Sequence, residues 1–139
     1  MTDQEILSRL EIRINVFEKA FNSLKELDEG VDYSDLEKAG FIQRFEFCFE
    51  LSWKLIKSIL DYNGISTKSP RDSIKEGLAS DIIDEGDLWV DMQESKNILS
   101  HTYDQEKSLK VFEKLIQYIG EYEKLLEKSK QFYAENRSN

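Results

Sequence analysis

Hydrophobic residues recur at intervals of three or four positions along most of this chain, which is the period of an amphipathic helix. Over residues 3 to 28 this pattern predicts a long helix with one apolar face, which Gly30 is expected to end. That face consists of Ile6, Leu10, Ile14, Phe17, Phe21, Leu24 and Leu27. Because the remaining positions are mostly polar, we expect one side of this helix to cover a core and the other to meet water.

The second predicted helix, residues 34 to 62, is apolar over most of its circumference. Two neighbouring stripes run along it: Phe41, Phe45, Cys48, Ser52, Leu55 and Ile59 in one, and Phe49, Trp53, Ile56 and Leu60 in the other. Such a helix has to be covered by several neighbours, so we expect it at the centre of the fold, partly covered by a second subunit. In its narrow charged band Glu50 and Lys54 are expected to pair, and Asn63-Gly64 is expected to end the helix.

Two shorter helices are expected in the middle of the chain. In TKSPRDSIKEGL, residues 67 to 78, Ser69 is a suitable N-cap and Pro70 suits the first helical position. Gly77 is expected in the last turn of this helix. The apolar spacing resumes over residues 86 to 100 and predicts the next helix there.

A last long helix is expected to begin at residues 102 to 105, where Thr-Tyr-Asp-Gln fits a capping box. Its apolar face comprises Leu109, Phe112, Ile116, Ile119, Tyr122 and Leu126. The sequence thus predicts an all-α protein, a four-helix up-and-down bundle with an additional short helix. We expect a single helical-bundle domain over residues 1–132, followed by a polar, frayed tail over residues 133–139.

The composition argues against several other kinds of protein. One proline and six glycines in 139 residues are too few turn formers for an all-β chain. Cys48 and His101 are the only residues of their types, so the chain cannot form an intrachain disulfide and lacks the ligands of a structural zinc site. No apolar run approaches the roughly 18 residues of a membrane span, and the N-terminus lacks a secretion signal. We therefore expect a cytoplasmic protein with no membrane contact and no bound metal.

One stretch, ESKNILSHTYDQEK, combines groups that can handle a phosphate or a nucleotide. It holds His101, whose imidazole can exchange protons near neutral pH, and Lys96, whose ammonium can stabilise phosphate charge. Asn97 lies one helical turn before His101 and can orient its ring, while Ser100 and Tyr103 add hydroxyls. Because the net charge of −9 opposes binding of a phosphate backbone by the chain as a whole, such a site has to be a local cationic pocket.

A purely structural interpretation of the same stretch also fits. A histidine at a helix C-terminus commonly caps the helix, since the helix dipole favours a cation there. Tyr103 would then be a half-buried aromatic residue and Lys96 a solvated surface charge. Spacing alone favours this helix junction over a working site, because no Gly-rich phosphate loop or nucleophile–base motif occurs elsewhere in the sequence.

Several motifs together resemble a known family. FEFCFELSWKLIKSIL, SPRDSIKEG, a segment containing Trp89, and KNILSHTYD follow one another in the order seen in nucleotidyltransferase substrate-binding proteins of the HEPN superfamily (higher eukaryotes and prokaryotes nucleotide-binding). The resemblance spans about residues 5 to 130. It implies a helical-bundle homodimer that pairs with a separately encoded minimal nucleotidyltransferase. That partner would supply the metal-binding carboxylates, so ATP and Mg²⁺ would act through it. Such pairs resemble toxin–antitoxin modules.

The same resemblance implies roles for individual residues. In related HEPN ribonucleases an Arg, often followed by Asn, precedes a His, and these residues from two subunits cleave RNA without a metal. The matching positions here are Lys96, Asn97 and His101. Lysine keeps the charge but lacks the planar fork with which arginine grips a phosphate, which weighs against cleavage. In related pairs the nucleotidyltransferase attaches AMP to a Tyr shortly after the His, and Tyr103 occupies that position.

Three functions are compatible with these observations. The first is a binding subunit that docks a minimal nucleotidyltransferase, holds a nucleotide or substrate through Lys96, Asn97, Ser100, His101 and Tyr103, and accepts AMP on Tyr103. The second is a metal-independent endoribonuclease, a toxin that takes RNA as substrate, with His101 as the acid–base group and Lys96 holding the phosphate. The third is a helical scaffold without chemistry of its own. The first agrees best with the resemblance and with lysine at position 96.

Overall fold

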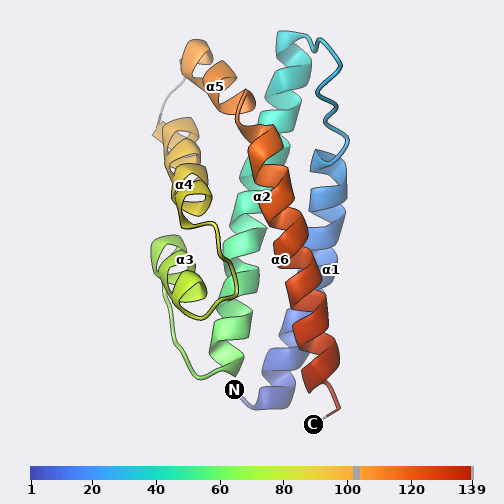
Figure 1. Cartoon of the computed structure of the whole chain (residues 1–139), viewed down its shortest axis with the longest axis vertical. Coiled ribbons are helices and arrows are strands. Elements are labelled where there is room, and N and C mark those ends of the chain that lie inside the picture. Colours follow the sequence, from blue (N-terminus) through green and yellow to red (C-terminus); the bar gives the residue numbers. More distant parts are fainter. Residues whose placement is uncertain (102–103, 139) are drawn as a thin grey trace.

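A computed structural model describes residues 1–101 and 104–138 of the chain, and these form an all-α bundle with no strand (Figure 1). Six helices lie within that part: α1 Asp3–Leu24, α2 Asp35–Tyr62, α3 Pro70–Ala79, α4 Gly86–His101, α5 Gln105–Phe112 and α6 Leu115–Asn136. The predicted fold class is confirmed. None of the helices in the described residues is both long enough and apolar enough to cross a membrane.

The long helices alternate in direction. In the view of Figure 1, α1 ascends, α2 descends, α3 and α4 lead back up, and α5 and α6 descend again, so both chain ends lie at the same end of the bundle. The shorter helices α3, α4 and α5 are stacked along one side of α2. As its apolar circumference predicts, α2 is central, since it packs against each of the other five helices described.

Side-chain caps mark the starts of α1, α2, α3 and α5. Ser34 forms the capping box of α2: its hydroxyl accepts the backbone N–H of Glu37 at 3.2 Å, and the Glu37 carboxylate accepts the Ser34 N–H at 2.9 Å. Ser69 caps α3 in front of Pro70, as expected. Gly64 follows the end of α2 with a positive φ of 81°, a conformation that glycine adopts without a steric penalty.

Two of the expected helix boundaries are wrong. Helix α1 ends at Leu24, well before Gly30, although Leu27 still reaches the core. The first residue of α5 is Gln105, within the range of residues 102 to 105 where a helix was expected to begin, and its cap is Asp104, whose carboxylate accepts the N–H groups of Glu106 and Lys107. Thr102, the first residue of the expected capping box, lies outside the described residues. The expected last helix is two helices, α5 and α6, because residues 113 and 114 form a turn between them, in which the Lys114 N–H donates to the Val111 carbonyl at 2.9 Å.

Tertiary packing explains the break between α5 and α6 and the length of α6. Phe112 packs edge-on against Tyr33 at one end of the bundle, whereas Leu115 begins a helix buried in the core. At the other end α6 continues to Asn136, past residue 133, where fraying was expected. Phe132 packs against Tyr62 of α2 with a ring-centroid distance of 5.4 Å, and Lys130 pairs with Glu18 of α1, so this last part has partners on two other helices.

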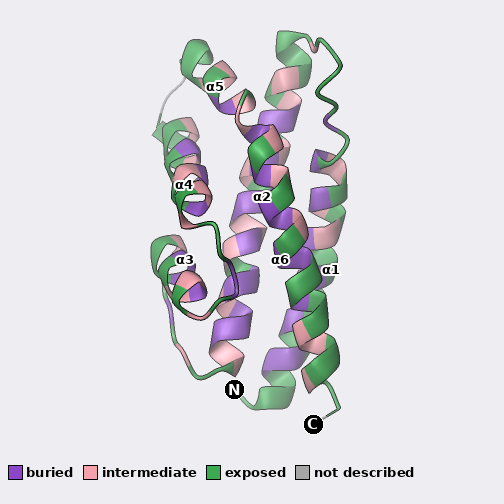
Figure 2. Cartoon of the chain, viewed as in Figure 1, coloured by how far each residue is buried: buried purple, intermediate pink, exposed green. Residues whose placement is uncertain are grey.

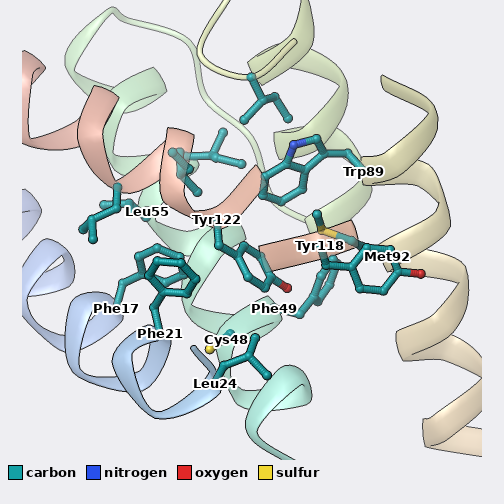
Figure 3. Close-up of a cluster of buried hydrophobic side chains, with 14 of the residues drawn as sticks. Phe17, Phe21, Leu24, Cys48, Phe49, Leu55, Trp89, Met92, Tyr118 and Tyr122 are labelled. Carbon is teal, nitrogen blue, oxygen red and sulfur yellow. The ribbon is translucent and has the colours of Figure 1, made fainter. Parts of the chain in front are cut away.

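The core is rich in aromatic side chains contributed by all the long helices. Figure 2 shows buried residues on the inward faces and exposed ones on the outward faces. In Figure 3 the ring of Tyr122 lies between the phenylalanines of α1 and Trp89 of α4. Tyr122 makes edge contacts with Phe17, Phe21 and Trp89 at centroid distances of 5.7, 6.1 and 5.9 Å. Burial raises the pKa of the Cys48 thiol beneath them to about 12, so this thiol stays protonated.

Candidate functional site

Lys96 points from α4 toward two carboxylates on α2. Its Nζ lies 3.7 Å from the nearer oxygen of Glu46 and 3.9 Å from that of Glu50, and the side chain is only 19% exposed. Nζ also donates a hydrogen bond of 3.2 Å to the Ser100 hydroxyl, which in turn donates to the Lys96 carbonyl at 2.9 Å. We call Lys96, Ser100, Glu46 and Glu50 the Lys96 cluster. It joins two of the five expected site residues, Lys96 and Ser100, on the face of α4 that meets α2.

Glu50 therefore has partners other than the expected Lys54. Its carboxylate accepts the indole N–H of Trp53 at 3.1 Å as well as lying near Lys96. The ammonium of Lys54 lies over the Trp53 ring, 6.0 Å from its centroid. The expected pairing of Glu50 with Lys54 along α2 is wrong, because tertiary contact with α4 gives the carboxylate a cation from another helix.

Asn97, the next residue, faces a different neighbour. It lines a groove of about 870 Å³ between α3 and α4, which we call the α3–α4 groove. The lining residues are Arg71, Asp72, Ile74, Lys75 and Leu78 from α3, and Val90, Gln93, Glu94 and Asn97 from α4. This volume lies within the range of about 300 to 1,000 Å³ that is typical of small-molecule sites. The sequence interpretation did not identify the residues of α3 as part of a site, and no local pattern shows which helix they face.

The charged side chains of the α3–α4 groove are Arg71 and Lys75 on α3, Asp72 near the start of α3, and Glu94 on α4. Arg71 and Lys75 are four residues apart, so they lie on one face of the helix. Within residues 1–101 and 104–138, neither cation forms an ion pair. Both side chains are exposed at the groove and available to an anionic group from outside the chain.

His101 is the last residue of α4 and is exposed. It lies one turn beyond Asn97, so the two share a face of α4, as the spacing predicts. In the part of the chain that the structure describes, no hydrogen bond joins the two side chains. Tyr103, the expected AMP acceptor, lies outside the described residues.

A partly buried polar network joins α4 to α6 and to the turn just before it. The Tyr118 hydroxyl donates a hydrogen bond of 2.5 Å to the Asp91 carboxylate and lies 2.9 Å from the Ser95 hydroxyl. Lys114 adds an ion pair with Asp91 at 3.1 Å. Burial and then the bond to Asp91 raise the pKa of Tyr118 well above its ordinary value, so the hydroxyl remains a donor. This network fixes the rotation of α4 and thereby decides which of its residues face α2 and which face α3.

No three side chains among His, Cys, Asp and Glu converge to hold a metal ion in the described residues. Of the carboxylates described, only those of Glu46 and Glu50 lie near Lys96, and its ammonium lies within 3.9 Å of both. The donor set of this region does not fit a Mg²⁺ ion held by this chain.

Comparison with known proteins gives a consistent result. Residues 12–131 match a family model described as "Nucleotidyltransferase substrate binding protein like". The sequence is 32% identical over 136 residues to a Haemophilus influenzae protein named "Probable ribonuclease HepT", covering 86% of this chain and 93% of that protein. A structure of HI0074 from the same organism, described as revealing the fold of a substrate binding domain of a nucleotidyltransferase, has a TM-score of 0.64 and 31% identity, covering 89% of this chain and 98% of that one. A crystal structure of a Thermus thermophilus protein has a TM-score of 0.75 and 30% identity, covering 81% of this chain and 98% of that one.

Proposed function

Because this chain belongs to the nucleotidyltransferase substrate binding protein-like family, as its motifs indicated, we propose that it is a substrate- or nucleotide-binding subunit of a separately encoded minimal nucleotidyltransferase. The two chains together form a toxin–antitoxin-like module, in which the partner carries out the transfer and this chain presents the acceptor. The ATP molecule that undergoes transfer and its Mg²⁺ ion are held by the partner; among the described residues of this chain no three metal-binding side chains come together.

The observation that carries this choice is the position of Lys96. A lysine that grips the phosphate of an RNA substrate needs a positive field around it, but two carboxylates lie within 3.9 Å of this ammonium. The cluster as a whole is negative, so an incoming phosphate meets repulsion before it reaches the ammonium. A binding subunit does not require a free cation at this position, whereas a phosphate-cleaving site does.

Tyr103 is the proposed acceptor of AMP. Its phenolic oxygen forms a bond to the α-phosphorus of ATP, the bond from that phosphorus to the α–β bridging oxygen breaks, and pyrophosphate leaves. The phenolic proton passes to a base, for which His101, two residues before Tyr103 and exposed at the end of α4, is the candidate in this chain. This assignment rests on the sequence motif and on the placement of His101.

A second candidate function is the metal-independent endoribonuclease. It is favoured by the name of the Haemophilus influenzae relative and by the exposed imidazole of His101, which follows Lys96 and Asn97 in the sequence motif. In this alternative the carboxylates of Glu46 and Glu50 would have to give up Lys96 when RNA binds. That requirement places it second.

The protein is also proposed to be a homodimer. Phe47 on α2 is 57% exposed and Val16 on α1 is 40% exposed, and both line an open groove of about 640 Å³ between these helices. Large apolar side chains that cluster on a surface usually mark an interface. The sequence pattern also predicted that a second subunit partly covers α2, although Phe47 belongs to neither of its two predicted apolar stripes.

The test is coexpression with the protein encoded by the adjacent gene, copurification, and intact-mass measurement after incubation with ATP and Mg²⁺. We expect a stable complex and additions of AMP units to the wild-type chain, absent from Tyr103→Phe and retained in Tyr133→Phe, a control on α6. An unmodified chain beside a demonstrably active nucleotidyltransferase refutes the acceptor role, as does modification mapped to another residue. If the chain neither copurifies with the protein encoded by the adjacent gene nor cleaves RNA, the remaining function is that of a helical scaffold.

A further inference from the structure

The α3–α4 groove presents two cations, Arg71 and Lys75, that form no ion pair within residues 1–101 and 104–138. The chain has 28 acidic and 19 basic residues, so carboxylates are in excess. Arg71 and Lys75 nevertheless stand on one face of α3 without an ion-pair partner among residues 1–101 and 104–138. A guanidinium and an ammonium one helical turn apart are suited to a phosphate, which the guanidinium can bind through two parallel hydrogen bonds.

The rest of the groove is suited to the other parts of a nucleotide. Val90 on α4 is 50% exposed, and it lines the groove together with Leu78 and the buried Ile74 of α3. These side chains form an apolar surface against which a base can lie. The amides of Gln93 and Asn97 each offer a donor and an acceptor to the edge of a base.

The charge balance of the groove distinguishes between ligands. Arg71 and Lys75 contribute two positive charges, and Asp72 and Glu94 contribute two negative charges, so the four cancel. A long polyanion such as RNA gains little from a site without net charge inside a chain of net charge −9. A mononucleotide gains more, because its phosphates meet the cations while its ribose hydroxyls and base amino group can donate to the carboxylates.

We propose that the α3–α4 groove binds a mononucleotide, with Arg71 and Lys75 holding its phosphates and with Gln93 and Asn97 contacting its base. This inference rests on the proposed function and supplies its nucleotide site. Val90, Glu94 and Asn97 line the groove from α4 at spacings of four and three residues, and the same row continues four residues on to His101. The bound nucleotide lies on the side of α4 that leads to His101, and not on the side that carries the Lys96 cluster.

The first experiment is calorimetric titration of the purified full chain with ATP and with AMP, without a divalent metal. We expect binding of ATP that Arg71→Gln and Lys75→Gln each weaken by about tenfold or more, as expected for the loss of one charged hydrogen-bonded contact. The matched control is Lys68→Gln, which removes an exposed cation that lies just before α3 and outside the groove. This control is expected to bind ATP like the wild type.

The second experiment needs no variant. In a ¹H–¹⁵N spectrum of the wild type, addition of ATP should shift the side-chain amide signals of Gln93 and Asn97 and leave those of Asn63 and Gln131, which lie outside the groove, in place. Absence of any shift at millimolar ATP overturns the proposal, and so does binding that both α3 variants leave unchanged. Tighter binding of an oligouridine RNA than of ATP at the same amides overturns the choice of a mononucleotide.

The two proposals can fail separately. If the neighbouring gene product copurifies and Tyr103 is modified while ATP produces no heat and no shift in the isolated chain, the groove assignment fails and the proposed function stands. If ATP binds in the groove but no partner copurifies, the proposed function fails and the groove assignment stands. If Arg71→Gln abolishes copurification and the ATP titration is flat, the groove is a surface for an acidic protein partner, and the mononucleotide proposal is overturned.

Discussion

Lys96 and Asn97 are neighbours in the chain, yet their side chains face different helices. The ammonium of Lys96 lies between Glu46 and Glu50 of α2, and the amide of Asn97 lines the groove opposite α3. Successive residues of an α-helix point about 100° apart, so a helix packed between two others divides a contiguous motif between them. The expected cluster of site residues is therefore spread over two faces of α4, each with its own chemistry.

The Lys96 cluster predicts the behaviour of the isolated chain toward RNA. We expect weak or no cleavage by the wild type, and little gain from Lys96→Arg alone, because the two carboxylates would hold a guanidinium as they hold the ammonium. Combining Lys96→Arg with Glu46→Gln and Glu50→Gln should raise cleavage by about tenfold or more, since the guanidinium becomes free for phosphate. The measurement is gel analysis of RNA incubated with a metal chelator.

The control for this series is His101→Ala in the same triple background, which should remove the gained activity if the imidazole is the acid–base group. We rank the nucleotidyltransferase-binding function above the ribonuclease function. Robust RNA cleavage by the wild type that disappears in His101→Ala would reverse this ranking.

The exposed apolar side chains on α1 and α2 predict a dimer. Sedimentation equilibrium of the wild type at micromolar concentration should give twice the chain mass of 16.4 kDa. Phe47→Asp should give a monomer with unchanged helix content, because this side chain is 57% exposed and contributes little to the core. Val31→Asp, at an exposed apolar residue outside these helices, is the matched control and should leave the dimer intact. A wild type that sediments only as a monomer would refute the dimer.

Two glycines in helices predict opposite effects of the same substitution. A Cβ on Gly77 of α3 would lie 2.8 Å from Cγ2 of the buried Ile56 on α2, so Gly77→Ala should destabilise the fold by about 1 to 3 kcal/mol through overpacking. A Cβ on Gly120 of α6 has no neighbour within 4 Å, so Gly120→Ala should stabilise it by about 0.5 to 1 kcal/mol through helix propensity. Urea denaturation measures both. A Gly77→Ala variant that is as stable as the wild type or more stable would contradict the packing of α3 against α2, and a destabilised Gly120→Ala variant would contradict the open surroundings of Gly120.

The capping box of α2 predicts a pH dependence. The Ser34 backbone N–H, and after it the Ser34 side chain, lowers the pKa of Glu37 below its ordinary value of 4.5. A carboxylate whose pKa is lower in the folded state than in the unfolded chain stabilises the fold when the pH is above its unfolded pKa. This stabilisation is lost as the pH falls through the lowered pKa of the folded state. Wild type should therefore be more stable than Glu37→Gln near neutral pH, and the difference should vanish in acid. Thermal melts across this range test the expectation, and a constant difference would contradict it.

The extents of most helices were predictable from the sequence because they depend on local interactions. Apolar periodicity identifies α1, α2 and α4, and hydroxyl caps at Ser34 and Ser69 set the starts of α2 and α3. The central place of α2 was also predictable, since a helix that is apolar nearly all round has to be surrounded. The interruption between α5 and α6 was not, because the spacing from Phe112 to Ile116 continues through it as though the helix were unbroken.

The sequence by itself determined which residues carry the candidate chemistry, namely Lys96, Asn97, Ser100, His101 and Tyr103, through the motif they form. Only the tertiary structure decided what the described ones face. Helix α2 places two carboxylates beside the ammonium of Lys96. Helix α3 places Arg71 and Lys75 across the groove from Asn97. The physical reason is that a helical period fixes the angles between side chains along one helix. The direction in which the whole helix is turned depends on buried contacts with other helices, here the network of Asp91, Ser95 and Tyr118.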